Sequence, residues 1–397
     1  EWDIAFQPYG TWWRRHRRAM HMSFHNKAVK AFFPVQSKHT RELLRRLLRS
    51  PDKYTEHLLH TAGAIIIEIA YGIEIQPEKD SYVETAQKVV HSIVEAGTPG
   101  KFFVDIWPWM KYIPAWVPGA GFQRKAARWR QYSNDMLELP FQESKKRMDD
   151  GNLDLCFVSS RLSEIESDAT THPYDEAIIK NAAATMFLAG TDTTTHTIRA
   201  FILAMILYPE VQKKAQREID SVLGFQRLPE VGDIDALPYV FAICKEALRW
   251  HPLLPSGVPH VASEDDVIQG YFIPKGTIVF GNAWMFLHND ADFGPNTNRF
   301  DPERYFIPGV RDPRSTGAFG FGRRICSGRH MGMNSIFLAI ASILQVFEIS
   351  KERDGSGKEI PVEAKFCSGF VSSATEFKCT IRPRSPTAED LIIRSVS

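Results

Sequence analysis

The sequence has no long apolar run and no closely spaced pair of cysteines. Its longest unbroken apolar run is the nine residues Ala200 to Tyr208, whereas a transmembrane helix needs about 20 apolar residues. This excludes a membrane-spanning helix. The five cysteines are odd in number and form no C-x-x-C pair, which argues against a disulfide framework and against structural zinc. A reducing compartment is therefore expected.

The chain also lacks a large net charge, since 48 Lys and Arg oppose 47 Asp and Glu among its 397 residues. The balance is uneven, because residues 1–50 carry eleven Lys and Arg and only three acidic residues. Such a segment is usually a solvated helix face, and otherwise a docking surface for an acidic protein, an anionic cofactor or a membrane. No recognised nucleic-acid-binding motif accompanies it, so nucleic acid is not expected as a partner.

A hydrophobic content of 44% supports a large core, and no Gly-, Ser- or Pro-rich linker divides the chain. We expect residues 1–397 to form one domain. Strand signals are short and lie mainly in 258–282 and 365–382, so the predicted fold class is mainly α, of the α+β type. Helical periodicity is clearest in four segments, namely 40–49, 57–71, 176–208 and 236–250.

The boundaries of the longest predicted helix are marked by its flanking residues. Asp175 is a suitable N-cap and Pro209 ends the segment. The same Pro209 suits the first turn of the next helix, which should stop at Gly224.

The most informative segment is F-G-F-G-R-R-I-C-S-G, residues 319–328, which precedes the helical run 336–347. Glycines there permit a tight turn and the close approach of a flat ligand. A cysteine at a helix N-terminus beside Arg323 and Arg324 should have a lowered thiol pKa, and the thiolate is the form that ligates metal. A lone cysteine is more often inert core, so the surrounding residues decide the interpretation.

The long helix contains A-G-T-D-T-T at residues 189–194. Its glycine and threonines lower helix propensity, which suggests a purpose other than helix stability. Gly190 could open the hydrogen-bond ladder and make room for a diatomic ligand, while Asp192 and Thr193 could supply a carboxylate and a hydroxyl for proton transfer. A Thr-rich buried helix is the plainer interpretation of this segment taken alone.

These motifs together resemble the cytochrome P-450 family. The pattern F-x-x-G-x-R-x-C-x-G is complete, and Ser327 stands where the family frequently has Pro. The segment E-A-L-R, from Glu246 to Arg249, resembles the family's E-x-x-R motif, and P-E-R-Y at 302–305 is similar to its PERF segment. The resemblance extends from about Gly10 to Ile393, with the motifs in the family's order, and is strongest to fungal members of secondary metabolism.

The resemblance implies haem b as cofactor, ligated by the Cys326 thiolate. It implies an acid role for Asp192 and an alcohol role for Thr193 in oxygen activation. It also implies a buried structural triad of Glu246, Arg249 and Arg304 behind the haem. The remaining residues that it implies for cofactor binding are Trp13 and Arg17 of W-R-R-H-R, Gly190, His260, Phe319, Arg324 and Gly328.

By the same resemblance, the chain inserts one oxygen atom from O2 into a small apolar organic substrate. The sequence has no flavin or nicotinamide fingerprint, so electrons are expected from a separate NADPH-cytochrome P-450 reductase. Family members carry a membrane anchor and a first β region ahead of the W-R-x-x-R helix. We expect both to be missing here, with association at the cytosolic face of the endoplasmic reticulum through that absent segment.

Two alternatives remain at this point. A haem-thiolate isomerase or dehydratase of the same fold would work without O2, but it is expected to lack the alcohol that Thr193 supplies. A non-catalytic haem-binding protein is the second, favoured if the missing N-terminal part prevents closure of the pocket.

Overall fold

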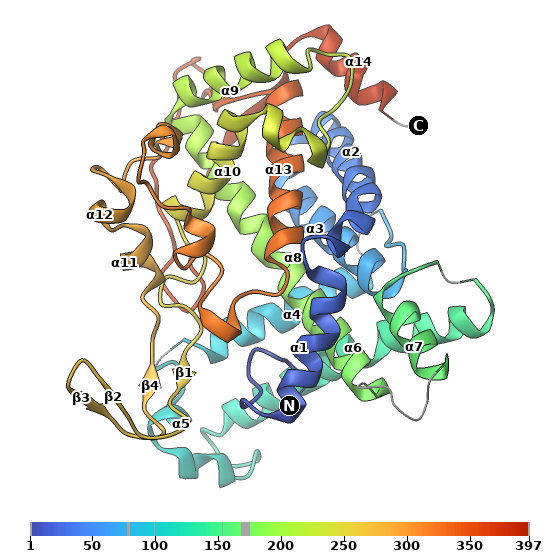
Figure 1. Ribbon diagram of the computed structural model, residues 1–397, viewed down its shortest axis with the longest axis vertical. Helices are drawn as coiled ribbons and strands as arrows, with labels where there is room; N and C mark the ends of the chain where they lie inside the picture. Colours follow the sequence, from blue (N-terminus) through green and yellow to red (C-terminus); the bar gives the residue numbers. More distant parts are fainter. Residues whose placement is uncertain (1, 78–79, 99, 153, 168–174, 396–397) are drawn as a thin grey trace.

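The computed structural model describes residues 2–77, 80–98, 100–152, 154–167 and 175–395 (Figure 1). The longer helices are α1 (Thr11–Phe24), α2 (Phe33–Arg49), α3 (Tyr54–Tyr71), α4 (Ser81–Ala96), α6 (Gly121–Asp149), α7 (Phe157–Ser167), α8 (Glu176–Leu207), α9 (Pro209–Val222), α10 (Pro238–Trp250), α13 (Arg329–Val346) and α14 (Pro386–Arg394). The short helices are α5 (Phe103–Ile106), α11 (Ala283–Leu287) and α12 (Asp290–Phe293), with 3-10 segments η1 (Ala28–Phe32), η2 (Pro51–Lys53), η3 (Pro108–Tyr112), η4 (Val231–Ala236), η5 (Pro302–Phe306), η6 (Pro313–Ser315) and η7 (Gly322–Arg324).

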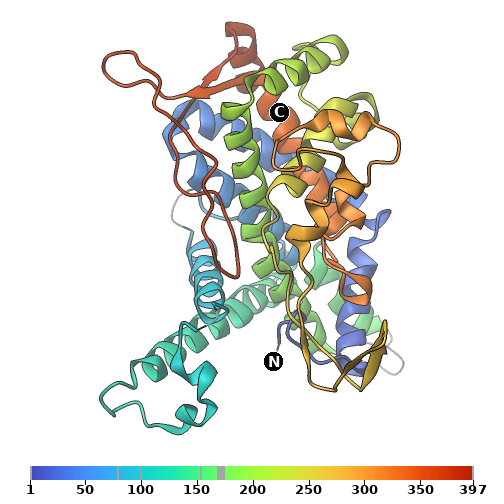
Figure 2. The same ribbon diagram turned by 90° about the vertical axis from the view of Figure 1, so that its left-hand side faces the viewer.

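Helix α8 runs through the middle of the molecule and contacts α1, α3, α4, α10 and α13 (Figures 1 and 2). Its N-terminus is capped as predicted, because the Asp175 carboxylate accepts from the Ile178 N–H at 2.9 Å. The helix ends at Leu207, and Pro209 then opens α9, also as predicted. Half of the 32 residues of α8 are apolar and buried, as expected for a helix enclosed by other helices.

Glycines allow α8 and α3 to approach closely. A Cβ added at Gly190 would lie 2.8 Å from Cγ1 of Ile66, a distance at which the two helices would have to separate. The helix is continuous from residue 176 to 207, so the expectation that Gly190 opens the hydrogen-bond ladder is wrong. Its missing side chain serves interhelical packing instead.

The strands form two-stranded antiparallel sheets. They are β1 (His260–Val261) with β4 (Ile278–Val279), β2 (Asp266–Ile268) with β3 (Tyr271–Ile273), and β5 (Phe347–Lys351) with β6 (Cys379–Pro383). The first predicted strand region is confirmed, with β2 and β3 joined by a turn at Gln269 and Gly270. In the second region, β6 pairs with β5, a strand that directly follows α13 and that the sequence did not predict.

A charged network lies buried beneath α10. Oε1 of Glu246 accepts from Nη2 of Arg249 at 2.7 Å and from Nε of Arg304 at 3.1 Å. The backbone N–H of Asp301 and the hydroxyl of Tyr305 also donate to this carboxylate. Burial, followed by the negative charge of Glu246, raises the pKa of Tyr305 well above its ordinary value. The network joins α10 to the segment 299–305. Because its members are buried, removing the Glu246 carboxylate would leave the charges of Arg249 and Arg304 without their partner.

We predict that Glu246→Ala lowers the free energy of unfolding by about 3–5 kcal/mol, because it leaves two buried guanidinium groups unpaired. Urea unfolding followed by circular dichroism measures this change. The matched control is Glu210→Ala, which removes an ion pair to Arg299 with both side chains more than half exposed and should cost less than about 1 kcal/mol. Equal effects of the two substitutions would contradict the role of burial.

Candidate active site

Cys326 lies in the loop between η7 and α13. Its backbone N–H donates to the carbonyl of Phe319 at 2.8 Å, which folds the loop back on itself. Gly320 and Gly322 have φ angles of 79° and 52°, in the left-handed region that glycine adopts without steric cost. A Cβ added at Gly328 would meet nothing within 4 Å. The loop therefore presents the cysteine just before the first turn of α13, with open space beside it.

The thiol of Cys326 is accessible, yet desolvation by the surrounding protein raises its pKa. The two observations agree if protein encloses the sulfur on most sides and leaves one side open. The N–H groups of Gly328 and Arg329 and the charges of Arg17 and Arg329 act in the opposite direction and lower the pKa. The sequence predicted a net lowering, which is wrong for the polypeptide alone because desolvation outweighs these groups.

Helix α1 brings cationic and N–H donors to this loop. Arg17 donates to the Ser327 hydroxyl and to the Ile325 carbonyl. Trp13, one turn earlier, is 4% exposed, and its Nε1 has no hydrogen-bond partner within the described residues. The guanidinium of Arg324 lies over the Trp13 ring, 4.4 Å from its centroid. Three of the residues predicted to bind the cofactor are thus brought together at one place.

Arg324 has a second function in the structure. Its Nη2 donates to the carbonyl of Gln7 at 2.8 Å and its Nη1 to that of Ile4 at 3.3 Å, so it also holds the N-terminal segment. His260 lies elsewhere, on β1, where its backbone is paired with that of Val279. Its side chain is exposed and makes no hydrogen bond to the described parts of the chain. Of the predicted donors, it is the one that the structure does not join to the others.

Side chains in the polar segment of α8 form hydrogen bonds with groups one turn away on the same helix. The hydroxyl of Thr193 donates to the Ala189 carbonyl at 2.8 Å. Asp192 accepts from Nε2 of His196 at 2.8 Å. His196 was not among the predicted site residues, although the i, i+4 spacing to an acid could have indicated it. Ser327 was likewise noted as a departure from the family pattern and not as a partner of Arg17.

Several of these features fit a haem group. Ala189 and Thr193 are exposed although their helix is central, and the flanking Thr191 and Thr195 are buried. An accessible stripe on a central helix and an enclosed but accessible thiol are features that a bound cofactor would cover. The orphaned Trp13 Nε1, beside Arg17 and Arg324, suits its carboxylates, which need cationic or N–H partners. The residues present therefore fit the group.

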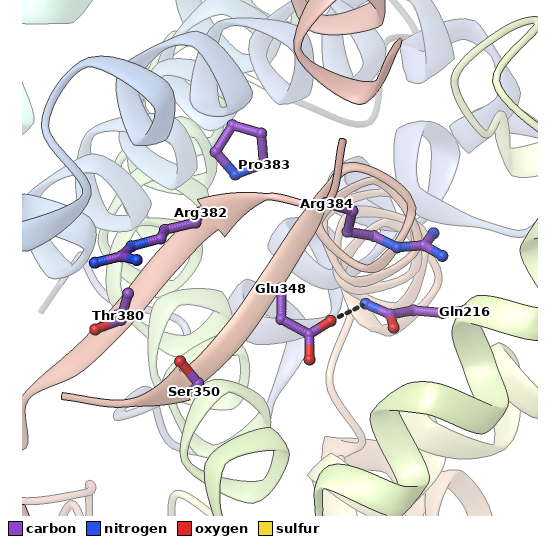
Figure 3. A pocket seen from close by; sticks show the side chains of 7 residues that line it. All are labelled: Gln216, Glu348, Ser350, Thr380, Arg382, Pro383 and Arg384. Carbon is purple, nitrogen blue, oxygen red and sulfur yellow. Dashed lines mark hydrogen bonds between the residues drawn. The ribbon is translucent and has the colours of Figure 1, made fainter. Parts of the chain in front are cut away.

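Two further recesses lie away from this stripe. One, of about 520 Å³, lies between α9 and the β5–β6 sheet (Figure 3), and none of the predicted site residues lines it. Its Glu348 accepts from Gln216. A smaller one, of about 60 Å³, lies beside the cysteine loop. It is lined by Arg17, His21, Phe24, His25, Ser327, Arg329 and His330.

The Cytochrome P450 family model matches residues 2–380. A cytochrome P450 monooxygenase of Armillaria gallica is 44% identical over 395 residues, which cover 99% of this chain and 77% of that protein. The tryptamine 4-monooxygenase of Psilocybe cyanescens is 38% identical over 404 residues, which cover 100% of this chain and 78% of that protein. A zebrafish cytochrome P450 solved with progesterone has the same fold, with a TM-score of 0.78 at 24% identity, over 96% of this chain and 85% of that one. The chain therefore belongs to the cytochrome P450 family, as a monooxygenase that binds haem through a cysteine thiolate and uses O2, a redox partner and an organic substrate.

Proposed function

We propose that the chain inserts one oxygen atom from O2 into a small, largely apolar substrate, with Cys326 as the thiolate ligand of haem b. The observation that supports this best is the accessible thiol at the start of α13, beside Arg17 and Arg329. When bound, the haem would activate O2 with the electron density that a thiolate donates. The polypeptide must hold that cofactor, deliver protons and accept electrons.

The other cysteines are poorer candidates for the ligand. Cys156 and Cys244 are buried, so their sulfur atoms are not accessible to a cofactor. Cys379 is only partly exposed and lies at the start of strand β6, not at the start of a helix. Cys367 is exposed, but its sulfur is engaged by the Ser373 backbone N–H and hydroxyl. Cys326 alone combines access with a position at the start of a long helix.

We predict that Cys326→Ala abolishes the thiolate-type absorption of the reduced, carbon monoxide-bound protein, because no sulfur then lies on the iron. Cys367→Ala is the matched control, since it also removes an exposed thiol, and it should keep the parent spectrum. Loss of the band in the control but not in Cys326→Ala would contradict the assignment.

Haem carboxylates would be held by Arg17, Arg324 and Trp13, whose polar atoms lie around the start of the cysteine loop. His260 is retained as a further donor, supplied by β1. Gly190, Phe319 and Gly328 are retained as cofactor-binding residues by the family resemblance, with Gly190 on α8 and Phe319 and Gly328 at the two ends of the cysteine loop.

For oxygen activation, we propose that Asp192 acts as the acid and Thr193 as the alcohol. Both lie on one turn of α8, and Thr193 is on its accessible stripe. A positioned carboxyl and hydroxyl can transfer protons to a bound ligand. The same alcohol argues against an isomerase or dehydratase, which would not need it.

We predict that Thr193→Ala keeps the haem content of the parent but lowers product formed per electron several-fold, because proton delivery follows oxygen binding. The lost electrons should appear as hydrogen peroxide or water. Thr194→Ala is the matched control on the same helix, outside the exposed stripe. Unchanged product per electron in Thr193→Ala would contradict the alcohol role.

An NADPH-cytochrome P450 reductase is proposed as the electron donor, docked on a cationic surface beside the cysteine loop. Arg14 and Arg18 are exposed on α1. The Tyr9 ring lies between Arg14 and Arg323, at 5.9 and 5.6 Å from their guanidinium carbons. Arg15 lies on the same helix, but it pairs with Asp175 at 3.4 Å. We therefore define the docking surface by Arg14, Arg18 and Arg323.

We predict that Arg14→Glu with Arg18→Glu slows reduction by the reductase by roughly tenfold at low salt, because charge steering raises association rates. The difference should shrink at high salt, and substrate binding should not change. The control is Lys213→Glu with Arg217→Glu, an exposed pair with the same i, i+4 spacing on α9. Equal rates and salt dependence in both double variants, measured by stopped flow, would contradict the docking surface.

Membrane association at the endoplasmic reticulum is proposed for this chain, as its resemblance to the fungal members of the family implies. No helix in the described parts of the chain is long and apolar enough to cross a bilayer. The region 100–120 projects from one end of the molecule (Figure 2) and exposes Trp107, Trp109, Tyr112 and Trp116. Trp and Tyr are typical of membrane–water interfaces, so this region supports contact with a membrane surface.

A further inference from the structure

We propose that His196 is a positioning residue of this site, which orients the Asp192 carboxyl and passes protons to it. The proposal rests on the acid role proposed for Asp192. Nε2 of His196 lies 2.8 Å from Oδ2 of Asp192, one turn earlier on α8. The side chains are only 15% and 23% exposed. The pair lies on the same helical turn as Thr193, where protons would be needed.

The other ring nitrogen of His196 provides the second observation. Nδ1 is buried and has no hydrogen-bond partner among the residues that the structure describes. A buried polar atom without a partner is destabilising, so a merely structural pair would favour a residue without this second nitrogen. An imidazole paired at Nε2 and unpaired at Nδ1 can accept a proton at one end and donate one at the other.

The proposed step transfers protons only and changes no oxidation state. In the neutral form protonated at Nε2, the ring gives its Nε2 proton to Oδ2 of Asp192, while a water molecule that reaches the buried Nδ1 supplies a proton to that nitrogen. The carboxylate becomes a carboxylic acid and the imidazole remains neutral. Asp192 then passes its proton to the hydroxyl oxygen of Thr193, and that hydroxyl releases its own proton towards the reacting site. The ring regains its first tautomer by proton exchange with the same water, and a permanently charged Arg could not serve this purpose.

An ordinary helix-surface ion pair does not have these properties. The i, i+4 pair of Lys88 and Glu84 has its closest atoms 3.9 Å apart, and both side chains are about half exposed. Such exposed pairs contribute little to helix stability. The His196–Asp192 contact is shorter, less exposed and next to the proposed alcohol, which favours a role in the reaction.

The test uses the haem-loaded full chain with its reductase and compares His196→Gln with Thr193→Ala. Glutamine can still donate a hydrogen bond to Asp192, but it cannot carry a proton. We expect His196→Gln to lower product per electron several-fold, to raise hydrogen peroxide, and to leave the KM for substrate unchanged. His39→Gln is the matched control, because His39 pairs with Glu68 at 2.7 Å with similar exposure and lies on α2. It should behave like the parent.

A second readout does not depend on turnover. Nitrogen-15 NMR of labelled histidines in the reduced, carbon monoxide-bound protein should show a neutral His196 ring with its proton on Nε2 in the parent, and His196 signals that move in Asp192→Asn. If His196→Gln keeps the parent's product per electron while Thr193→Ala loses it, this inference is wrong and the proposed function stands. If Thr193→Ala also keeps the parent's value, the proton-delivery part of the proposed function is wrong as well.

Discussion

The buried carboxylate of Glu246 is the constraint on which the architecture around the cysteine loop depends. It accepts from two guanidinium groups, a hydroxyl and a backbone N–H, and so joins α10 to the segment 299–305. Buried charges are tolerated only when each has its partners. The chain from η5 to α13, which includes the cysteine loop, therefore starts from a segment that is fixed by this network.

Helix α8 both packs in the core and carries the proposed acid and alcohol. Its buried faces are apolar, and the absence of a side chain at Gly190 lets α3 approach. Its accessible stripe carries Ala189 and Thr193, with the Asp192–His196 pair beside it. The cost in helix propensity of a glycine and several threonines is small for a helix enclosed by others, because tertiary packing supplies most of its stability.

The ends of α8 and the position of the cysteine loop were predictable, because short stretches of sequence determine them. Asp175 and Pro209 mark the ends of α8, and the spacing of residues 319–328 indicates the cysteine loop. Contacts between distant segments were not predictable in the same way. The pairing of Arg15 with Asp175, the packing of Gly190 on Ile66 and the desolvation of Cys326 all depend on which elements meet in space. The prediction of one domain and the roles of the site residues stay predictions.

The most direct test of the account is the position of the iron in a crystal of the haem-loaded protein, found from its anomalous scattering. We expect one iron peak bonded to Sγ of Cys326, with Thr193 of α8 beside the haem and with Arg17 and Arg324 holding its carboxylates. A peak bonded to any other cysteine, or on Cys326 with α8 remote from the haem, would contradict the account.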